Sequence, residues 1–260
     1  MFLETRPLVL LFFFLAGLAA GSLAVVVIHR DRARLPLLKG ALQCPVCSAP
    51  APWTERIPLV SYLAGRGLRK GCGCKIRIRD PLVELAIGLA WALVAARIGL
   101  SWVLPAFLAY ATTLIVLSAV DFDERRIPNK VLGPMSIVGA LLLTIAVLAA
   151  GDPRTLVRLA IGAIAYALPM LVLGLIAPGA MGMGDIKLAG YIGMHLAWLS
   201  LIHVLAGAFL AFLIGAIVGL TLVALRKKGR KDTVPFGPSM ALGGFLPLFL
   251  GPATTAFLQF

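Results

Sequence analysis

Charged side chains are scarce in this chain of 260 residues. They make up 13% of it, whereas hydrophobic residues make up 60%. Soluble globular domains carry about 25% charged and about 45–50% apolar residues. The shortage of charge excludes an ordinary soluble enzyme and an intrinsically disordered chain, and a composition this apolar is typical of a protein whose solvent is lipid. We therefore expect an all-α, polytopic membrane helix bundle.

Acidic residues are the rarer charge. The chain has 11 Asp and Glu against 24 Lys and Arg, which gives a net charge of +13. Such a balance can indicate nucleic-acid binding, but these basic residues lie in the gaps between apolar runs and are not interleaved with aromatic residues. We therefore expect no nucleic-acid partner, and we interpret the basic loops as indicators of membrane topology.

Long hydrophobic runs are abundant. A membrane-spanning helix needs about 20 mostly apolar residues, and the sequence predicts about eight transmembrane helices, with the long run after residue 186 divided at Ser200. The predicted helices cover residues 7–28, 81–97, 101–120, 131–150, 155–177, 186–200, 201–225 and 239–259.

The loops of this arrangement differ strongly in charge. Those on one side, at residues 30–80, 121–130, 178–187 and 226–236, hold 20 of the 24 Lys and Arg. Loops rich in Lys and Arg face the cytoplasm. The first apolar run is followed by its arginines, whereas a cleavable signal peptide is preceded by them. We therefore expect a multi-pass protein of the cytoplasmic (inner) membrane with its N-terminus outside.

Cysteine is nearly absent, since the chain has four, which excludes a disulfide scaffold. All four lie in the polar segment 30–80, as the pairs Cys44/Cys47 and Cys72/Cys74. A cytoplasmic loop is kept reduced, and two close pairs resemble a zinc ribbon, in which four thiolates surround Zn²⁺. The sequence therefore predicts a structural zinc site in a small zinc-ribbon-like insert. The alternative is four free thiols used as small hydrophobic side chains.

Two of the few acidic residues lie at the edges of apolar runs. Asp121 ends the run 114–120, and Asp185 stands in Gly182-Met183-Gly184-Asp185, where a later run begins. Both are expected at cytoplasmic helix ends, and an ionisable residue at membrane depth is a candidate functional residue. Gly182 and Gly184 allow a positive φ and a close backbone approach, so we expect them to bind substrate beside Asp185.

A bundle that brings these two carboxylates together suits peptide hydrolysis. Neighbouring carboxyl groups share one proton, so the ionised member withdraws a proton from water while the protonated member polarises the scissile carbonyl. The 64 residues between Asp121 and Asp185 do not by themselves establish that the two meet. The alternative is that each is a helix N-cap or a solvated loop charge.

Other catalytic arrangements are missing from the sequence. It contains neither a Gly-x-Ser-x-Gly element nor a glycine-rich nucleotide fingerprint. Asp123 and Glu124 are expected to be solvated, and Glu84 is expected inside the second predicted helix. His195 and His203 are single histidines in apolar runs, where packing or a hydrogen bond within a helix is the usual role.

Several short motifs follow one another through most of the chain. They are Gly21-Ser22 with Val26-Val27-Ile28-His29-Arg30, residues 57–63, residues 79–85, Asp121 with Ile127-Pro128-Asn129, Gly182-Met183-Gly184-Asp185, and Pro235-Phe236-Gly237-Pro238. In this order they resemble the motifs of the type IV prepilin peptidases. The Gly-x-Gly-Asp element is similar to that of intramembrane aspartic proteases in general.

The resemblance implies an aspartic endopeptidase that removes the basic leader of type IV prepilins or pseudopilins on the cytoplasmic side, after a glycine. It implies Asp121 and Asp185 as the catalytic pair and a zinc site for the cysteines of the first loop. Many members of the family also methylate the new N-terminal amine with S-adenosylmethionine. N-methyltransferase activity is therefore a further expectation, and the residues that bind the methyl donor are unknown.

The cysteine pattern departs from the family at one position. Counted back from Pro81, Cys72 matches the family's fourth cysteine, and Arg69 stands at the third. Cys74, two residues beyond Cys72, is expected to supply the missing ligand. The predicted zinc ligands are Cys44, Cys47, Cys72 and Cys74.

The expected organisation is a first transmembrane helix at residues 1–29, the cysteine-containing insert at 30–80 and a transmembrane protease core at 81–260. Two alternatives stay open: a non-enzymatic transporter or assembly scaffold, and a methyltransferase that has lost cleavage. A transporter places polar groups near the bilayer midplane. Asp121 and Asp185 are expected at one surface, which favours a protease that meets a cytoplasmic substrate there.

Overall fold

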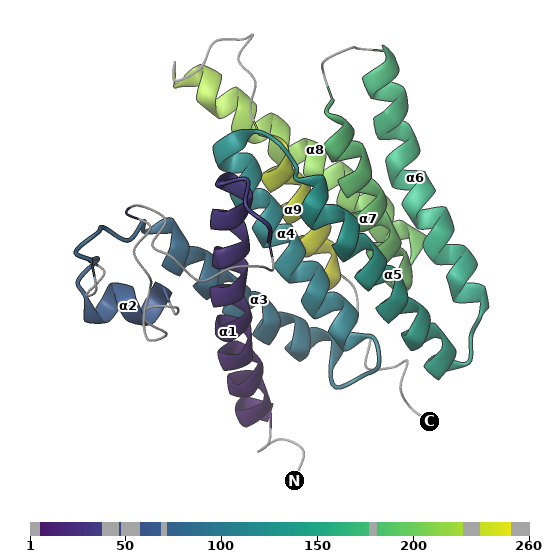
Figure 1. Cartoon of the computed structure of the whole chain (residues 1–260). Coiled ribbons are helices and arrows are strands. Elements are labelled where there is room, and N and C mark those ends of the chain that lie inside the picture. Colours follow the sequence, from purple (N-terminus) through teal and green to yellow (C-terminus); the bar gives the residue numbers. More distant parts are fainter. Residues whose placement is uncertain are drawn as a thin grey trace. The chain divides into compact units, whose positions relative to one another are not determined.

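The computed structural model describes residues 6–37, 47, 58–68, 72–176, 181–225 and 235–250. Their regular structure is helical, which confirms the all-α class. Figure 1 labels the helices, which are α1 (Arg6–Arg32), α2 (Pro58–Ala64), α3 (Arg79–Ile98), α4 (Leu104–Glu124), α5 (Asn129–Ala150), α6 (Arg154–Ile176), α7 (Met183–Leu199), α8 (Leu201–Ala224) and α9 (Gly237–Phe245), followed by the 3₁₀ turn η2 (Leu246–Phe249).

The chain divides into two compact units, Met1–Ala96 and Arg97–Phe260. The first holds α1, α2 and most of α3. In it, α1 and α3 approach each other through glycines, since a Cβ atom on Gly17 would lie 2.8 Å from the Cα of Gly88. Real Cβ atoms do not come this close to backbone, so the crossing requires residues without side chains, as is typical of helices that pack in membranes.

Glu84 joins the three helices of the first unit. It is fully buried, and Ser22 of α1 donates from its Oγ to Glu84 Oε1 at 2.6 Å. The backbone N–H of Leu59, at the start of α2, donates to Glu84 Oε2 at 2.7 Å. Both carboxylate oxygens are engaged in holding helices together, and Glu84 lies inside the second predicted helix as expected.

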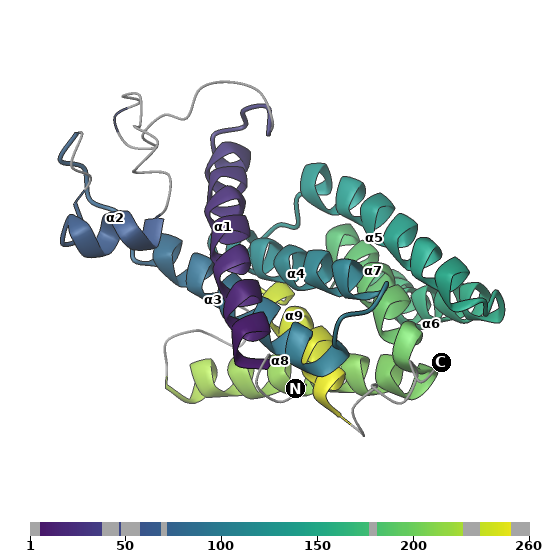
Figure 2. The ribbon, with the colours of Figure 1, turned by 90° about the horizontal axis from the view of Figure 1, so that it is seen from below.

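In the second unit, α4 and α7 are the interior helices. The apolar stretch of α4 is 72% buried, whereas those of α5, α6 and α8 are 33%, 22% and 17% buried. Nine of the 17 residues of α7 are buried. The outer helices expose large apolar side chains such as Leu141, Ile164 and Leu205, as expected of surfaces that face lipid. In Figure 2, α9 lies between α4 and α8.

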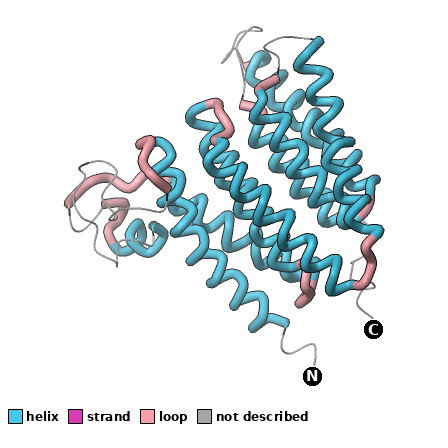
Figure 3. The backbone as a smooth tube through the Cα atoms, turned by 45° about the vertical axis from the view of Figure 1, so that its right-hand side comes forward, coloured by secondary structure: helices cyan, strands magenta, loops and turns pink. Residues whose placement is uncertain are grey.

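Close glycine contacts also hold α6 against α7, which are labelled as neighbours in Figure 1. Figure 3 draws the described elements of the chain as helices joined by loops. A Cβ atom on Gly193 would collide with the carbonyl oxygen of Gly162. The two helix backbones therefore lie in contact here, without a side chain between them. The interior position of α7 follows from this contact.

Six described helices are long and apolar enough to cross a membrane: α1, α3, α4, α5, α6 and α8. The prediction of about eight spans includes two further elements. With 17 residues, α7 is about 26 Å long at 1.5 Å per residue, which is at the lower end of the range of about 17–25 residues for a spanning helix. The run 239–259 forms only α9 and η2 within the described residues, because Pro247 lacks the N–H that would continue the helix.

The predicted boundary at Ser200 is confirmed. Ser200 ends α7 with extended backbone, at φ −174° and ψ 166°, and its side chain accepts a hydrogen bond from the N–H of His203 in the first turn of α8. Serine is a preferred N-cap because its oxygen satisfies one of the unpaired donors at a helix start. One polar residue thus divides a continuous apolar run into two helices.

Candidate active site and cysteine cluster

Asp121 lies in the last turn of α4 and is 5% exposed. Its Oδ2 atom accepts a hydrogen bond of 2.8 Å from the backbone N–H of Gly237, which is 116 residues away in the sequence. Gly237 is the first residue of α9. The carboxylate therefore meets the N-terminal end of a helix, where unpaired N–H groups and the helix dipole favour negative charge.

Asp185 lies in the first turn of α7 and is half-buried. Its Oδ2 accepts a hydrogen bond of 3.2 Å from the backbone N–H of Gly182, the N-cap residue of α7. This is half of a capping box. Asp185 is therefore at the third position of the helix and not at its N-cap, and it uses one of its two carboxylate oxygens to cap α7.

The helix ends that carry the two acids lie together. Gly184, beside Asp185, packs on Ile127 in the connection after α4, where an added Cβ atom would lie 2.8 Å from Ile127 Cβ. Asp185 lies outside the six candidate spans. Burial raises the pKa of its carboxyl group to about 6, and the charge of Asp121 also raises this pKa. Because Gly184 and Ile127 are in contact, the end of α4 and the start of α7 meet, and the structure brings both acids to one end of the second unit.

Each acid keeps one oxygen outside these backbone contacts. Asp121 and Asp185 both use Oδ2 for their hydrogen bonds. Within the described part of the chain, neither Oδ1 atom has a hydrogen-bond partner. One oxygen of each carboxyl group is therefore available to a water molecule or to a shared proton.

Gly182 and Gly184 have conformations that differ from those expected. Gly182 is extended, with φ −78° and ψ 145°, and Gly184 is helical because α7 begins at Met183. Neither is among the described glycines with positive φ. Ile127 occupies the space next to the Gly184 Cα. A contact of either glycine with substrate stays a prediction.

The polar residues beside the pair contact one another. Asp123 and Glu124 lie in the last turn of α4 and not in the loop that was expected. Asp123 is exposed, and Glu124 Oε2 lies 2.6 Å from Arg126 Nε. Lys187 donates from its Nζ to Asn129 Oδ1 at 3.0 Å. This lysine therefore links the starts of α7 and α5.

A cavity of about 640 Å³ lies between α5, α6 and α7. It begins two residues beyond Asp185 on α7 and continues to Met194. Most of its walls are small or apolar, and one end is polar. It is lined by Asn129, Leu132, Gly133, Ser136, Ala163, Lys187, Gly190, Tyr191 and Met194.

The two histidines of the apolar runs have the packing and helix-end roles that were expected. His195 is fully buried and stacks on Tyr110 with a centroid distance of 4.5 Å, and its Nδ1 lies 2.9 Å from the Tyr191 carbonyl oxygen. His203 Nδ1 lies 2.7 Å from Ser200 Oγ at the start of α8.

The contact of Gly237 with Asp121 is a site feature that the sequence did not predict. The motif Pro235-Phe236-Gly237-Pro238 carried a family resemblance but no role. The available signal was a glycine at the first position of a short helix, followed by a proline. That signal marks a helix start and does not indicate which side chain meets it.

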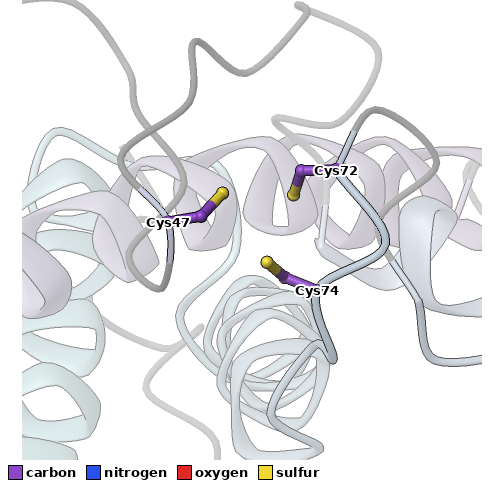
Figure 4. Close-up of side chains that lie close together, drawn as sticks. All are labelled: Cys47, Cys72 and Cys74. Atoms are coloured by element: carbon purple, nitrogen blue, oxygen red, sulfur yellow. The ribbon is translucent and has the colours of Figure 1, made fainter.

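In the first unit, Cys47, Cys72 and Cys74 place their sulfur atoms within 4.8 Å of one another. Figure 4 shows the three side chains pointing toward a common centre. Gly73, at φ +68°, turns the chain between two of them. Zn–S bonds of about 2.3 Å place the sulfurs of a tetrahedral site about 3.8 Å apart, so three thiolates fit a metal after a small shift. Cys44, the fourth predicted ligand, lies outside the described residues.

The fold and the site together define a multi-pass helical membrane protein in which two aspartates meet at one end of a bundle, the arrangement of a membrane aspartic peptidase. Comparison with known proteins agrees. Residues 15–98 match the bacterial peptidase A24 N-terminal domain, and residues 108–220 match the type IV leader peptidase family. The chain belongs to this family, as the sequence motifs indicated.

Relatives align along nearly the whole chain. The prepilin leader peptidase/N-methyltransferase of Aeromonas salmonicida (strain A449) is 32% identical, over 93% of this chain and 91% of its own length. The protein of that name from Stutzerimonas stutzeri is 32% identical over 100% and 97%, and that from Bacillus subtilis (strain 168) is 29% identical over 94% and 95%. No solved structure matches the chain.

Proposed function

We propose that this chain is a prepilin leader peptidase in which Asp121 and Asp185 together activate a water molecule. Its relatives carry that name, and both acids lie within the segment that matches the type IV leader peptidase family. The observation that supports these roles most directly is the convergence of two carboxylates from α4 and α7, each held through Oδ2 by a backbone N–H.

The two remaining oxygens account for the chemistry. Neighbouring carboxyl groups share one proton. The ionised member takes a proton from water as the water oxygen attacks the scissile carbonyl carbon, and the protonated member gives its proton to the carbonyl oxygen. The carboxyl group that took the water proton then gives it to the amide nitrogen, while the other carboxylate takes a proton from a hydroxyl of the tetrahedral intermediate. The C–N bond breaks as the carbonyl re-forms, and the pair again holds one shared proton. The products are the leader's carboxyl group and a new N-terminal amine.

The proposed substrate is a type IV prepilin or pseudopilin, in which a short basic leader precedes an apolar helix. Because Asp121 and Asp185 lie at helix ends, the scissile bond is placed near the membrane surface. The 20 basic residues on that side of the predicted topology support a cytoplasmic active site and an N-terminus outside. Gly182 and Gly184 stay the proposed substrate contacts beside Asp185. Gly182 is exposed, whereas the space next to the Gly184 Cα is occupied by Ile127.

The cavity beside α7 suits the apolar part of this substrate. It begins next to Asp185, and the small residues Gly133, Ala163 and Gly190 widen it between three helices. A helix that enters it from the lipid buries apolar surface against protein and places its end beside the acids. We therefore propose that the residues following the scissile bond lie in this cavity.

Methylation of the new amine is the second proposed activity. It is supported by the printed names of the relatives, which include N-methyltransferase. S-adenosylmethionine supplies a methyl group to a deprotonated amine. The chain offers no residues that we assign to the methyl donor.

Zn²⁺ is the proposed metal of the cysteine cluster. Cys47, Cys72 and Cys74 converge in the structure, and Cys44 is the proposed fourth ligand. Thiolates are preferred zinc ligands, and four of them leave no open position for water. The metal is therefore assigned a structural role, which is to close a polar segment that has little core of its own.

The test of the function is to incubate the purified protein with a prepilin peptide, with and without S-adenosylmethionine. The proposal predicts cleavage without the methyl donor and methylation of the product when the donor is present. Cleavage without methylation would support the proposed peptidase activity and refute the proposed methyltransferase activity. Methylation of a pre-cleaved peptide without cleavage would indicate the methyltransferase alternative. Neither reaction would favour the transporter or scaffold alternative.

A further inference from the structure

We infer that the backbone N–H of Gly237, at the start of α9, positions the catalytic carboxylate of Asp121. The inference rests on the proposed peptidase function and adds a residue to its machinery. Gly237 acts through Asp121 and does not touch the substrate. It lies outside both segments that match the family descriptions, residues 15–98 and 108–220.

The hydrogen bond is short and shielded. Gly237 N–H donates to Asp121 Oδ2 at 2.8 Å, and both residues are buried. It is the only hydrogen bond of the Asp121 side chain within the described residues. A hydrogen bond between a carboxylate and a backbone N–H away from water is stronger than a neutral one, so it fixes which oxygen of Asp121 remains for chemistry.

Space, rather than backbone conformation, is the reason for glycine at this position. Gly237 is not among the described residues with positive φ. A Cβ atom on Gly237 would lie 2.7 Å from Asp121 Oδ2, and 3.0 Å from both Cβ and Cγ of the same side chain. Any larger residue must therefore move the carboxylate itself.

α9 is held in place at its other end as well. Tyr110 on α4 donates from its hydroxyl to the carbonyl oxygen of Gly244 at 2.9 Å, and a Cβ atom on Gly243 would lie 2.5 Å from the backbone N of Ala211 on α8. With Gly237 beside Asp121 and Gly244 beside Tyr110, α9 runs antiparallel to α4. The donor is thus carried by a helix that is anchored to its neighbours before substrate arrives, which is the preorganisation that catalysis requires.

The direct test removes the donor without adding atoms. Replacing Gly237 by glycolic acid, through nonsense suppression in the full-length protein, exchanges the N–H for an ester oxygen and leaves no Cβ. We expect kcat for prepilin cleavage to fall about 10-fold or more, and KM to change less than about twofold, because the group acts on the reacting carboxylate. Gly237→Ala, which displaces Asp121, is expected to lose about 100-fold in kcat.

A matched control is Gly219→Ala on α8, where an added Cβ meets nothing within 4 Å, and its kcat is expected to equal that of the wild type. Wild-type kcat in the ester variant, with Asp121→Asn inactive, would overturn the inference and leave the peptidase intact. An ester variant in which kcat falls, KM rises and the Tm falls to similar extents would also overturn the inference, because the hydrogen bond would then only anchor α9. A wild-type protein that does not cleave would instead refute the proposed function.

Discussion

At the scale of single residues, four buried or half-buried acids of this protein have short contacts to polar groups. Asp121 and Asp185 each accept a backbone N–H, and Glu84 accepts one N–H and one hydroxyl. Asp80, at 3% exposed, lies 2.8 Å from His29 Nε2. Because an unpaired buried carboxylate is very costly, each acid has a defined orientation.

Glu84 gives a prediction about stability. Glu84→Leu leaves the Leu59 N–H without its acceptor, and a buried unsatisfied group costs about 1–3 kcal/mol. Thermal unfolding in detergent should therefore show a clearly lower Tm. Glu84→Gln keeps an acceptor and should lose less. The surface control Glu124→Gln should stay within about 0.5 kcal/mol of the wild type. A Glu84→Leu protein as stable as the wild type would disprove the role of Glu84 as a link between helices.

The sequence identified the acids but not their donors. Asp121 and Asp185 stand out because carboxylates are rare in apolar runs, and this signal is local. The Gly182 contact is also local, since it is part of a helix start. The Gly237 contact joins residues 116 positions apart, and its cause is the packing of α9 on α4. Such a contact depends on three-dimensional fit, which no spacing rule supplies.

At the scale of elements, helix positions followed from hydropathy and breaker residues. The division at Ser200 was predicted from the length of the apolar run, which is too great for one span, and the structure shows that Ser200 is the N-cap of α8. Within the described residues, the C-terminal run forms a shorter helix than expected, because hydropathy does not register Pro247, whose missing N–H interrupts the helix. The run of α7 was recognised from hydropathy, which does not distinguish a helix buried in protein from one buried in lipid.

The cavity between α5, α6 and α7 gives a prediction about substrate binding. Gly133 lines it, and an added Cβ there meets nothing within 4 Å. Gly133→Leu should therefore fold normally and fill part of the cavity. We expect KM for a prepilin to rise several-fold with little change in kcat, because only binding space is lost. Gly219→Leu, at an equally open position of α8 that does not line the cavity, is the control and should leave KM unchanged. An unaltered KM in Gly133→Leu would place the substrate elsewhere.

The cysteine insert gives a prediction about metal content. Mass spectrometry or a chromogenic chelator should find about one zinc per chain in the purified protein, since four thiolates bind one Zn²⁺. Replacing Cys47 and Cys72 by serine should remove the metal. His195→Ala, which changes a packed histidine far along the chain, should keep it. A fully active preparation without metal would contradict the assignment.

At the scale of the whole molecule, the chain combines two units with different tasks. The first unit, Met1–Ala96, carries the cysteine cluster, and the second, Arg97–Phe260, carries both aspartates. This division falls near the gap between the two matched family segments, at residues 98 and 108. Within the second unit, the acids come from its two interior helices, whose burial in protein allows a polar site to exist beside lipid.

The central claim is that Asp121 and Asp185 act as one catalytic pair, and the most direct measurement is leader cleavage of a prepilin by membranes that contain each Asp→Asn variant. Asn keeps the size of the side chain but holds neither the charge nor the shared proton. We expect Asp121→Asn and Asp185→Asn to insert normally and to cleave nothing, while Asp123→Asn, exposed and two residues from the pair, retains most activity. Complete processing of the leader by Asp185→Asn would contradict the account.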